Sequence, residues 1–178
     1  MELFQETIAT ITLVFTVLAL LTAMASLFVK VPYVPTKKQV ALKMIKVAHL
    51  KKNDIVYDLG CGDGRLLFEA EKNADINAKG YELAPIPYFF AKIQQFFLKS
   101  KTSIQMANFF SANLKDANII FCYLSPDIMV KLYKKIKKEC KKGTKIVSNT
   151  FSVRGVEPSR VWIKNQKQKL PNIYLYEI

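Results

Sequence analysis

Histidine and acidic residues are scarce in this chain of 178 residues. It has one histidine, His49, and 14 Asp and Glu against 27 Lys and Arg, so its formal net charge is +13. A single histidine excludes a zinc site built on several histidines, and it argues against a catalytic triad that uses histidine as its base. The three cysteines, Cys61, Cys122 and Cys140, are too few for a disulfide framework, and their odd number favours reduced thiols.

Repetitive and disordered architectures are also excluded. The sequence shows neither a Gly-X-Y period nor a run of heptads, which rules out collagen and coiled coil. Hydrophobic residues make up 51% of the chain, too many for a disordered protein. The length suits one domain with a short appendage.

Charge is absent between Glu6 and Lys30. As a helix, residues 7–29 would be about 34 Å long, enough for a bilayer core of about 30 Å. Apolar residues occupy every face of that helix, whereas a buried helix of a soluble domain normally keeps a polar stripe. A cleaved signal peptide needs a basic start, and residues 1–6 are acidic. We therefore predict a membrane anchor at residues 1–30, with a central core helix as the alternative.

The charges that flank this segment predict its orientation. No Lys or Arg precedes it, and five lysines follow it closely: Lys30, Lys37, Lys38, Lys43 and Lys46. Basic flanks remain on the cytoplasmic side of a membrane. The prediction is a single-pass protein whose remaining chain is cytoplasmic.

A short linker at residues 31–36 joins the anchor to the rest of the chain. Pro32 and Pro35 disfavour helix there and predict an extended connection. Thr36 is a candidate N-cap for a helix over residues 37–50. The remaining domain is expected to cover residues 37–178.

Beyond the linker, hydrophobic patterns of strands and helices alternate. Strands are expected at residues 55–59, 78–83, 103–107, 118–123 and 145–151, with helices at 64–72, 85–99 and 126–140. Residues 161–164 and 173–178 should form a closing antiparallel hairpin around Pro171. This order predicts an α/β fold with a mostly parallel, doubly wound sheet and functional groups at the carboxyl ends of its strands.

A glycine-rich turn follows the first of these strands. Residues 58–64 read Asp-Leu-Gly-Cys-Gly-Asp-Gly, and the next helix begins at their end. Glycine lets a ligand lie against bare backbone. A dinucleotide fingerprint would place its third glycine one residue later, and the carboxylates of Asp58 and Asp63 would repel a pyrophosphate. The same carboxylates suit a ligand that carries an ammonium and a sulfonium.

An acidic residue, Glu82, ends the second predicted strand. A carboxylate at this interval after the turn can accept hydrogen bonds from both hydroxyls of an adenosine ribose. The alternative for Glu82 is an exposed carboxylate in a loop.

From about Lys37 onward, the sequence resembles the class I S-adenosylmethionine-dependent methyltransferases, with a Rossmann-like fold. The turn at residues 58–64 is similar to the first motif of that family, and Glu82 to its acidic second site. The resemblance implies that four residues hold the methionine portion and the sulfonium: Asp58, Gly60, Cys61 and Gly62. It also implies ribose binding by Glu82 with Leu83 beside it, and adenine binding by Asn108 and Phe109. Asn108 departs from the usual Asp, although its side-chain oxygen can accept the same hydrogen bond.

A narrower resemblance concerns the protein lysine methyltransferases that modify the adenine nucleotide translocase and the ATP synthase c-subunit, with their prokaryotic relatives. Shared features are the N-terminal anchor, the Val-Pro-Thr linker, the turn, the Gly-Tyr-Glu-Leu sequence at 80–83, and Phe151. Cys61 departs from a frequent serine. The resemblance implies a lysine acceptor and a linker that covers the cofactor with Tyr33, Val34, Pro35 and Thr36.

Residues 121–126, which end the fourth strand, lie where class I enzymes place acceptor-facing groups. Tyr123 and Ser125 are therefore the candidate catalytic residues, with half-buried packing as the alternative for Tyr123. A lysine acceptor must lose its proton from a pKa of about 10.4, and an apolar entrance would lower that value. Much of the catalysis can then come from alignment.

Two helices carry further hypotheses. The aromatic residues of the helix at 85–99 are expected to pack in the core, with Phe89 or Phe90 as candidates for lining the cofactor pocket. The lysine-rich helix at 126–140 is expected to be solvated, or to lie against anionic lipid.

Other functions were weighed against this interpretation. An NAD-dependent oxidoreductase conflicts with the glycine spacing, and a nucleic-acid role lacks an added RNA-binding module. Methylation of a small molecule, lipid or RNA stays open, as does a membrane-anchored module that binds the cofactor without turnover.

Overall fold

The computed structural model describes residues 1–29 and 34–178. Its helices are α1 (Glu2–Val29), α2 (Lys38–Ala48), α3 (Arg65–Asn73), α4 (Pro85–Leu98) and α5 (Pro126–Glu139), with one 3-10 turn, η1 (Phe109–Ser111). Its strands are β1 (Ile55–Leu59), β2 (Asn77–Glu82), β3 (Ser103–Met106), β4 (Ile119–Cys122), β5 (Lys145–Asn149), β6 (Arg160–Trp162) and β7 (Ile173–Glu177). The expected elements agree with these bounds to within a few residues, and η1 was not predicted.

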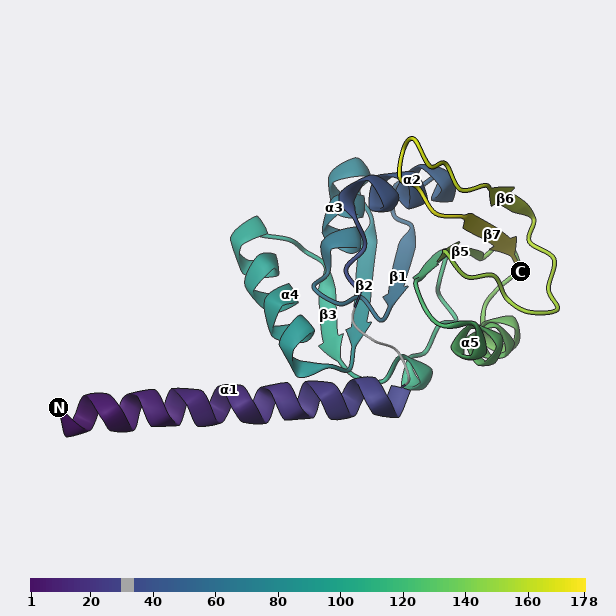
Figure 1. Ribbon diagram of the computed structural model, residues 1–178. Helices are drawn as coiled ribbons and strands as arrows, with labels where there is room; N and C mark the ends of the chain where they lie inside the picture. Colours follow the sequence, from purple (N-terminus) through teal and green to yellow (C-terminus); the bar gives the residue numbers. More distant parts are fainter. Residues whose placement is uncertain (30–33) are drawn as a thin grey trace.

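The strands form one seven-stranded sheet in the order β3-β2-β1-β4-β5-β7-β6. Strands β1 to β5 pair in parallel, whereas β7 is antiparallel to both β5 and β6. This arrangement confirms the predicted Rossmann-like α/β fold with its closing hairpin (Figure 1).

The register brings the glycine-rich turn and the segments after β2 and β4 together at the carboxyl ends of the strands. Leu59, the last residue of β1, pairs with Tyr81 on one side and with Cys122 on the other. The glycine-rich turn after β1 therefore lies between the carboxyl ends of β2 and β4.

Two hydrophobic clusters cover the two faces of the sheet. Helices α2 and α3 pack on one face, where the sheet contributes Val56, Phe121 and Val147. Helix α5 packs on the other face against residues that include Leu59 and Ile120. Because both faces of β4 are covered, all four of its residues are buried, as expected of a central parallel strand.

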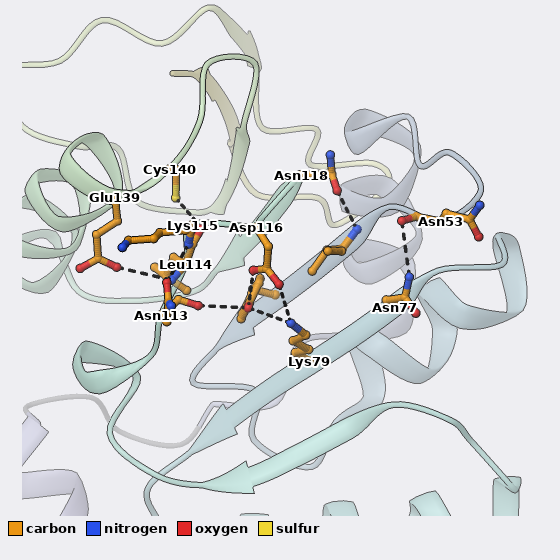
Figure 2. Close-up of polar contacts among 12 residues, drawn as sticks. Asn53, Asn77, Lys79, Asn113, Leu114, Lys115, Asp116, Asn118, Glu139 and Cys140 are labelled. Carbon is orange, nitrogen blue, oxygen red and sulfur yellow. Dashed lines mark hydrogen bonds and ion pairs between the residues drawn. The ribbon is translucent and has the colours of Figure 1, made fainter.

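A polar network holds β1 and β2 to the loop before β4 (Figure 2). The hydroxyl of Tyr57 donates to Asp116 Oδ1 at 2.7 Å and accepts from Lys79 Nζ at 3.1 Å, while Lys79 also pairs with Asp116 Oδ2 at 2.7 Å. Burial, together with the hydrogen bond to Asp116, raises the pKa of Tyr57 to about 12. The phenol therefore stays neutral at physiological pH and links the two charges.

The start of α2 differs from the sequence prediction. Lys37 occupies the N-cap position, and no side chain caps the helix there. The predicted N-cap at Thr36 was wrong, because the extended linker continues one residue further. At the other end, His49 adopts a left-handed conformation with φ of 51° and ends the helix.

Most aromatic residues of α4 do not pack in the core. Helix α4 buries Pro87 and Ala91, and half-buried Tyr88 packs against the core cluster. The side chains of Phe96 and Phe97 are 80% and 77% exposed. The prediction of core packing is confirmed for Tyr88 and was wrong for the phenylalanines, because α4 lies at the β3 edge of the sheet and needs only one narrow stripe to pack there.

Helix α1 projects away from the rest of the chain (Figure 1). Its segment Glu2–Met24 has 23 residues and a mean hydropathy of 2.2, and none of its most apolar window is buried within the protein. The backbone N–H of Ile86, in the first turn of α4, donates to Thr22 Oγ1 at 3.1 Å. By length and composition α1 is suited to cross a membrane, and it meets the domain at α4.

We predict that Tyr57→Phe lowers the free energy of unfolding by about 1 kcal/mol, because the substitution removes hydrogen bonds while Lys79 and Asp116 can still pair with each other. Urea unfolding in mild detergent, followed by circular dichroism, measures the change.

The matched control is Tyr133→Phe, whose hydroxyl makes no hydrogen bond within residues 1–29 and 34–178 and which should leave stability nearly unchanged. Equal unfolding midpoints for Tyr57→Phe and the unsubstituted protein would show that the network contributes nothing.

Candidate active site

The turn between β1 and α3 depends on glycine. Gly60, Gly62 and Gly64 have φ values of 85°, 57° and 79°, a region that favours glycine. A β-carbon on Gly64 would lie 2.7 Å from the ring of Phe68. The segment can therefore fold tightly over the end of the sheet only without side chains at these positions.

Strand β2 holds this turn in place. The backbone N–H groups of Gly60 and Cys61 both donate to the carbonyl of Tyr81, at 2.9 and 3.0 Å. A β-carbon on Gly80 would lie 2.7 Å from Cys61 Sγ, so the lack of a side chain at Gly80 lets Cys61 lie close against β2. This steric role of Gly80 was missed from the sequence, although the glycine stood in the Gly-Tyr-Glu-Leu motif.

Glu82 links the turn to the start of α4. Its Oε2 accepts from the backbone N–H of Gly62 at 2.9 Å, and its Oε1 accepts from the N–H of Ala84 at 2.8 Å. Burial raises the pKa of Glu82, although these N–H donors oppose the rise. Each carboxylate oxygen keeps a further lone pair, which suits acceptance of a ribose hydroxyl.

Asp58 lies at the end of β1 and is 6% exposed. Burial, then the negative charges of Glu82 and Asp63, raises its pKa to about 8. Within the described part of the chain no cation pairs with Asp58. A bound ammonium or sulfonium would offset the cost of its charge, so the site fits the methionine portion of S-adenosylmethionine.

Asp63 differs from the sequence prediction, which grouped it with Asp58. Its carboxylate pairs with Arg65 at 2.6 Å. Burial alone would raise the pKa of Asp63, but the hydrogen bonds and charge of Arg65 outweigh it and lower that pKa. Arg65 Nη1 also donates to the carbonyl of Thr36 at 3.4 Å, so this pair joins the turn to the linker instead of serving a ligand.

The remaining predicted cofactor residues lie around the same edge. Asn108 is exposed and begins η1, where its Oδ1 accepts from the N–H of Phe110 at 2.9 Å. The ring of Phe109 is buried in the core, which leaves only its backbone for a ligand. Leu83 is half-buried beside Glu82. Tyr33 lies outside the described residues.

A cavity of about 580 Å³ opens at the carboxyl ends of β4 and β5, the two strands that follow β1 in the sheet. No residue of the turn at 58–64 is among its described lining residues. The cavity brings together four residues predicted for the site, Val34, Pro35, Thr36 and Tyr123, with the loop between β6 and β7. Its full lining is Val34, Pro35, Thr36, Lys37, Val40, Tyr123, Asn149, Thr150, Lys164, Asn165, Gln166, Lys169, Leu170, Pro171 and Asn172. Ser125 does not line this cavity, and instead occupies the N-cap position of α5.

A strained turn shapes the wall of this cavity at the end of β5. Thr150 has a φ of 67°, and its N–H donates to the carbonyl of Asn172 at 2.8 Å. Its Oγ1 donates to Asn149 Oδ1 at 3.0 Å, and the ring of Phe151 stacks on Tyr123 at 6.1 Å. Of the residues in this turn, the sequence analysis identified only Phe151. Asn149 and Thr150 were missed because only the fold places them beside Tyr123.

The charges around the cavity are all positive. Lys37, Lys164 and Lys169 contribute to its lining, and none of its described lining residues is a carboxylate or a histidine. Such a site repels a cation and favours an amine in its neutral form.

Comparisons with known proteins agree with this geometry. The family described as ANTKMT methyltransferase domain matches residues 58–160. A "Protein-lysine N-methyltransferase" of Saccharolobus islandicus is 36% identical over 83% of this chain and 94% of its own length. The "Adenine nucleotide translocase lysine N-methyltransferase" of Mus musculus is 26% identical over 75% of this chain, which spans 62% of the mouse protein.

A solved structure shows the same architecture with a cofactor product. The RNA methyltransferase of Salinibacter ruber, in complex with S-adenosyl-L-homocysteine, superposes with a TM-score of 0.76 at 26% identity. The match covers 82% of this chain and 94% of that one.

The fold and the site define an S-adenosylmethionine-dependent methyltransferase. Within that class, the chain belongs to the ANTKMT methyltransferase domain family, and S-adenosylmethionine is its cofactor.

We predict that S-adenosylmethionine binds more tightly as pH rises. Asp58 is protonated below its pKa of about 8, whereas a cationic ligand favours the carboxylate, so binding expels a proton. Affinity should rise about tenfold per pH unit between about pH 6 and pH 7, and level off above about pH 8. Titration calorimetry in buffers of different ionisation enthalpy measures both the affinity and the released proton.

Asp58→Asn should abolish most of this pH dependence. The matched control, Asp127→Asn at the exposed start of α5, should retain it. The assignment fails if the unsubstituted protein binds with the same affinity across this range.

Proposed function

We propose that this methyltransferase transfers methyl groups to the ε-amino group of lysine residues in a protein at or near a membrane. The observation that carries the proposal is the cavity at the carboxyl ends of β4 and β5, which has three lysines and no carboxylate in its described lining. The relatives from Saccharolobus islandicus and Mus musculus, both named lysine methyltransferases, support the same acceptor.

The cavity favours the reactive form of the acceptor. A free lysine has a pKa of about 10.4, and only its neutral amine is a nucleophile. Lys37, Lys164 and Lys169 oppose an incoming ammonium, so a lysine that enters should release its proton to solvent. Bound S-adenosylmethionine supplies a methyl carbon open to in-line displacement, in which the N–C bond forms as the S–C bond breaks.

Residues at the ends of β4 and β5 are placed to align the acceptor amine. Tyr123, held by its stacking on Phe151, offers a rigid aromatic wall. The Oδ1 of Asn149 is fixed by the hydroxyl of Thr150, and its remaining lone pair can accept an N–H of the neutral amine. We propose Tyr123 and Asn149 as the acceptor-contacting residues; Ser125 lies outside this cavity and is a weaker candidate.

The domain organisation follows from the same interpretation. Residues 1–30 form the membrane anchor, residues 31–36 the linker that covers the cofactor, and residues 37–178 the catalytic domain on the cytoplasmic side. The exposed apolar helix α1 and the lysines after it support this arrangement. A tether raises the effective concentration of acceptors close to the bilayer.

Incubating the purified protein with methyl-labelled S-adenosylmethionine and native membranes tests the acceptor. We expect label on lysine side chains of a membrane-associated protein, identified by mass spectrometry of its peptides. Glu82→Ala, which removes an anchor of the cofactor turn, is the inactive control. Label confined to RNA, lipid or a small molecule would contradict the proposal.

The cavity lysines should set the pH dependence of catalysis. We predict that Lys164→Gln combined with Lys169→Gln moves the acidic limb of the kcat profile upward by about half a pH unit, because the bound acceptor ammonium loses two repelling charges. Steady-state rates with a lysine peptide from the identified acceptor measure the shift.

The matched control is Lys137→Gln with Lys138→Gln on the exposed side of α5, which should leave the limb in place. The electrostatic role of the cavity is wrong if both double variants show the same profile.

A further inference from the structure

Helix α4 exposes most of its large apolar side chains to solvent. Five large apolar side chains, each 47–80% exposed, form what we call the aromatic face of α4: Phe89, Phe90, Ile93, Phe96 and Phe97. The side facing the domain carries the buried Pro87 and Ala91, the half-buried Tyr88 and two glutamines. Gln94 donates to the carbonyl of Asp63, and Gln95 donates to the carbonyl of Thr102.

An apolar face of this size on a single helix marks a surface that is covered in the working protein. The sheet cannot be that cover, because α4 already meets it through its opposite side. The question is therefore which partner lies against this face.

Helix α1 indicates the partner. The hydrogen bond from Ile86 N–H to Thr22 Oγ1 joins α1 to the first turn of α4. From that contact α1 extends past α4 and away from the domain, and α4 runs across its direction as the outermost element on that side (Figure 1). The part of α1 before Thr22 is about 30 Å long, close to the thickness of a bilayer core.

The charges around the aromatic face fit a lipid surface. Lys92 and Lys99 are exposed on and directly after the helix, and Lys101 follows it closely. Interfacial helices combine phenylalanines on one face with lysines that reach the headgroups.

We propose that the aromatic face of α4 lies in the headgroup boundary of the same bilayer that α1 crosses. The inference rests on the proposed membrane anchor and adds a second, peripheral contact. Together the two helices would give the catalytic domain two separate contacts with the bilayer, which fix its orientation. The basic helix α5 lies at the other end of the domain from α4 (Figure 1), so a flat bilayer that contacts α4 does not reach α5.

Hydrogen bonds connect α4 to the glycine-rich turn. Gln94, on the domain side of α4, binds the carbonyl of Asp63 at 3.3 Å, and Glu82 binds the N–H of Ala84 just before the helix. A bilayer that holds α4 therefore also holds the backbone on which the cofactor lies.

Fluorescence quenching in the full chain tests the proposal. The only tryptophan is Trp162, so Trp162→Phe provides a silent background. Single reporters are then placed by Phe97→Trp on α4, Phe15→Trp on α1, Ile163→Trp after β6 and Lys138→Trp on α5. All four positions are exposed, and each variant is reconstituted in nanodiscs whose lipids carry brominated acyl chains.

We expect the α1 and α4 reporters each to lose about half of their emission or more, because an interfacial side chain lies about 5–10 Å into the acyl boundary. The reporters after β6 and on α5 should be unaffected. Quenching at α1 without quenching at α4 would overturn the inference and leave the anchor intact. Quenching at neither would overturn both, and quenching at α5 in place of α4 would assign the bilayer to the basic helix. An α4 face covered by a second copy of the chain would be shielded but unquenched, which also overturns the inference.

Discussion

The site depends on the close approach of a glycine-rich turn to the end of β2. Gly80 lets Cys61 lie against the strand, and the carbonyl of Tyr81 accepts from two successive N–H groups of the turn. Glu82 then closes the arrangement by accepting from Gly62. The positive φ of Gly60, Gly62 and Gly64 and the close contact between Gly80 and Cys61 disfavour larger residues, so substitutions at these glycines should distort the proposed cofactor surface.

The same compact arrangement buries two acids at one edge. Asp58 and Glu82 both have raised pKa values because burial penalises their charge, whereas Asp63 is neutralised by Arg65. The neighbouring cavity has the opposite character, with lysines and no carboxylate among its described lining residues. The acidic region around the turn would attract a sulfonium, and the basic cavity would favour a neutral amine. This arrangement suits the proposed transfer of a methyl group to nitrogen.

Two exposed apolar surfaces, α1 and the aromatic face of α4, meet at Thr22 and Ile86. The proposed membrane contact and the glycine-rich turn are therefore linked through α4, which begins shortly after Glu82 and contacts Asp63 through Gln94.

The sequence by itself determined the alternation of strands and helices, the glycine turn, Asp58 and Glu82, because each depends on local pattern or on spacing along the chain. It also placed Tyr123 at the end of the fourth strand, where the structure has it directly after β4. Tertiary structure alone decided that Asp63 pairs with Arg65, that Asn149 and Thr150 meet the loop at 164–172, and that the phenylalanines of α4 face outward. Helical spacing reveals that an apolar stripe exists but not which way it turns, since that depends on where the helix sits at the edge of the sheet. Contacts between residues distant in the chain likewise arise only when the strands take their order in the sheet.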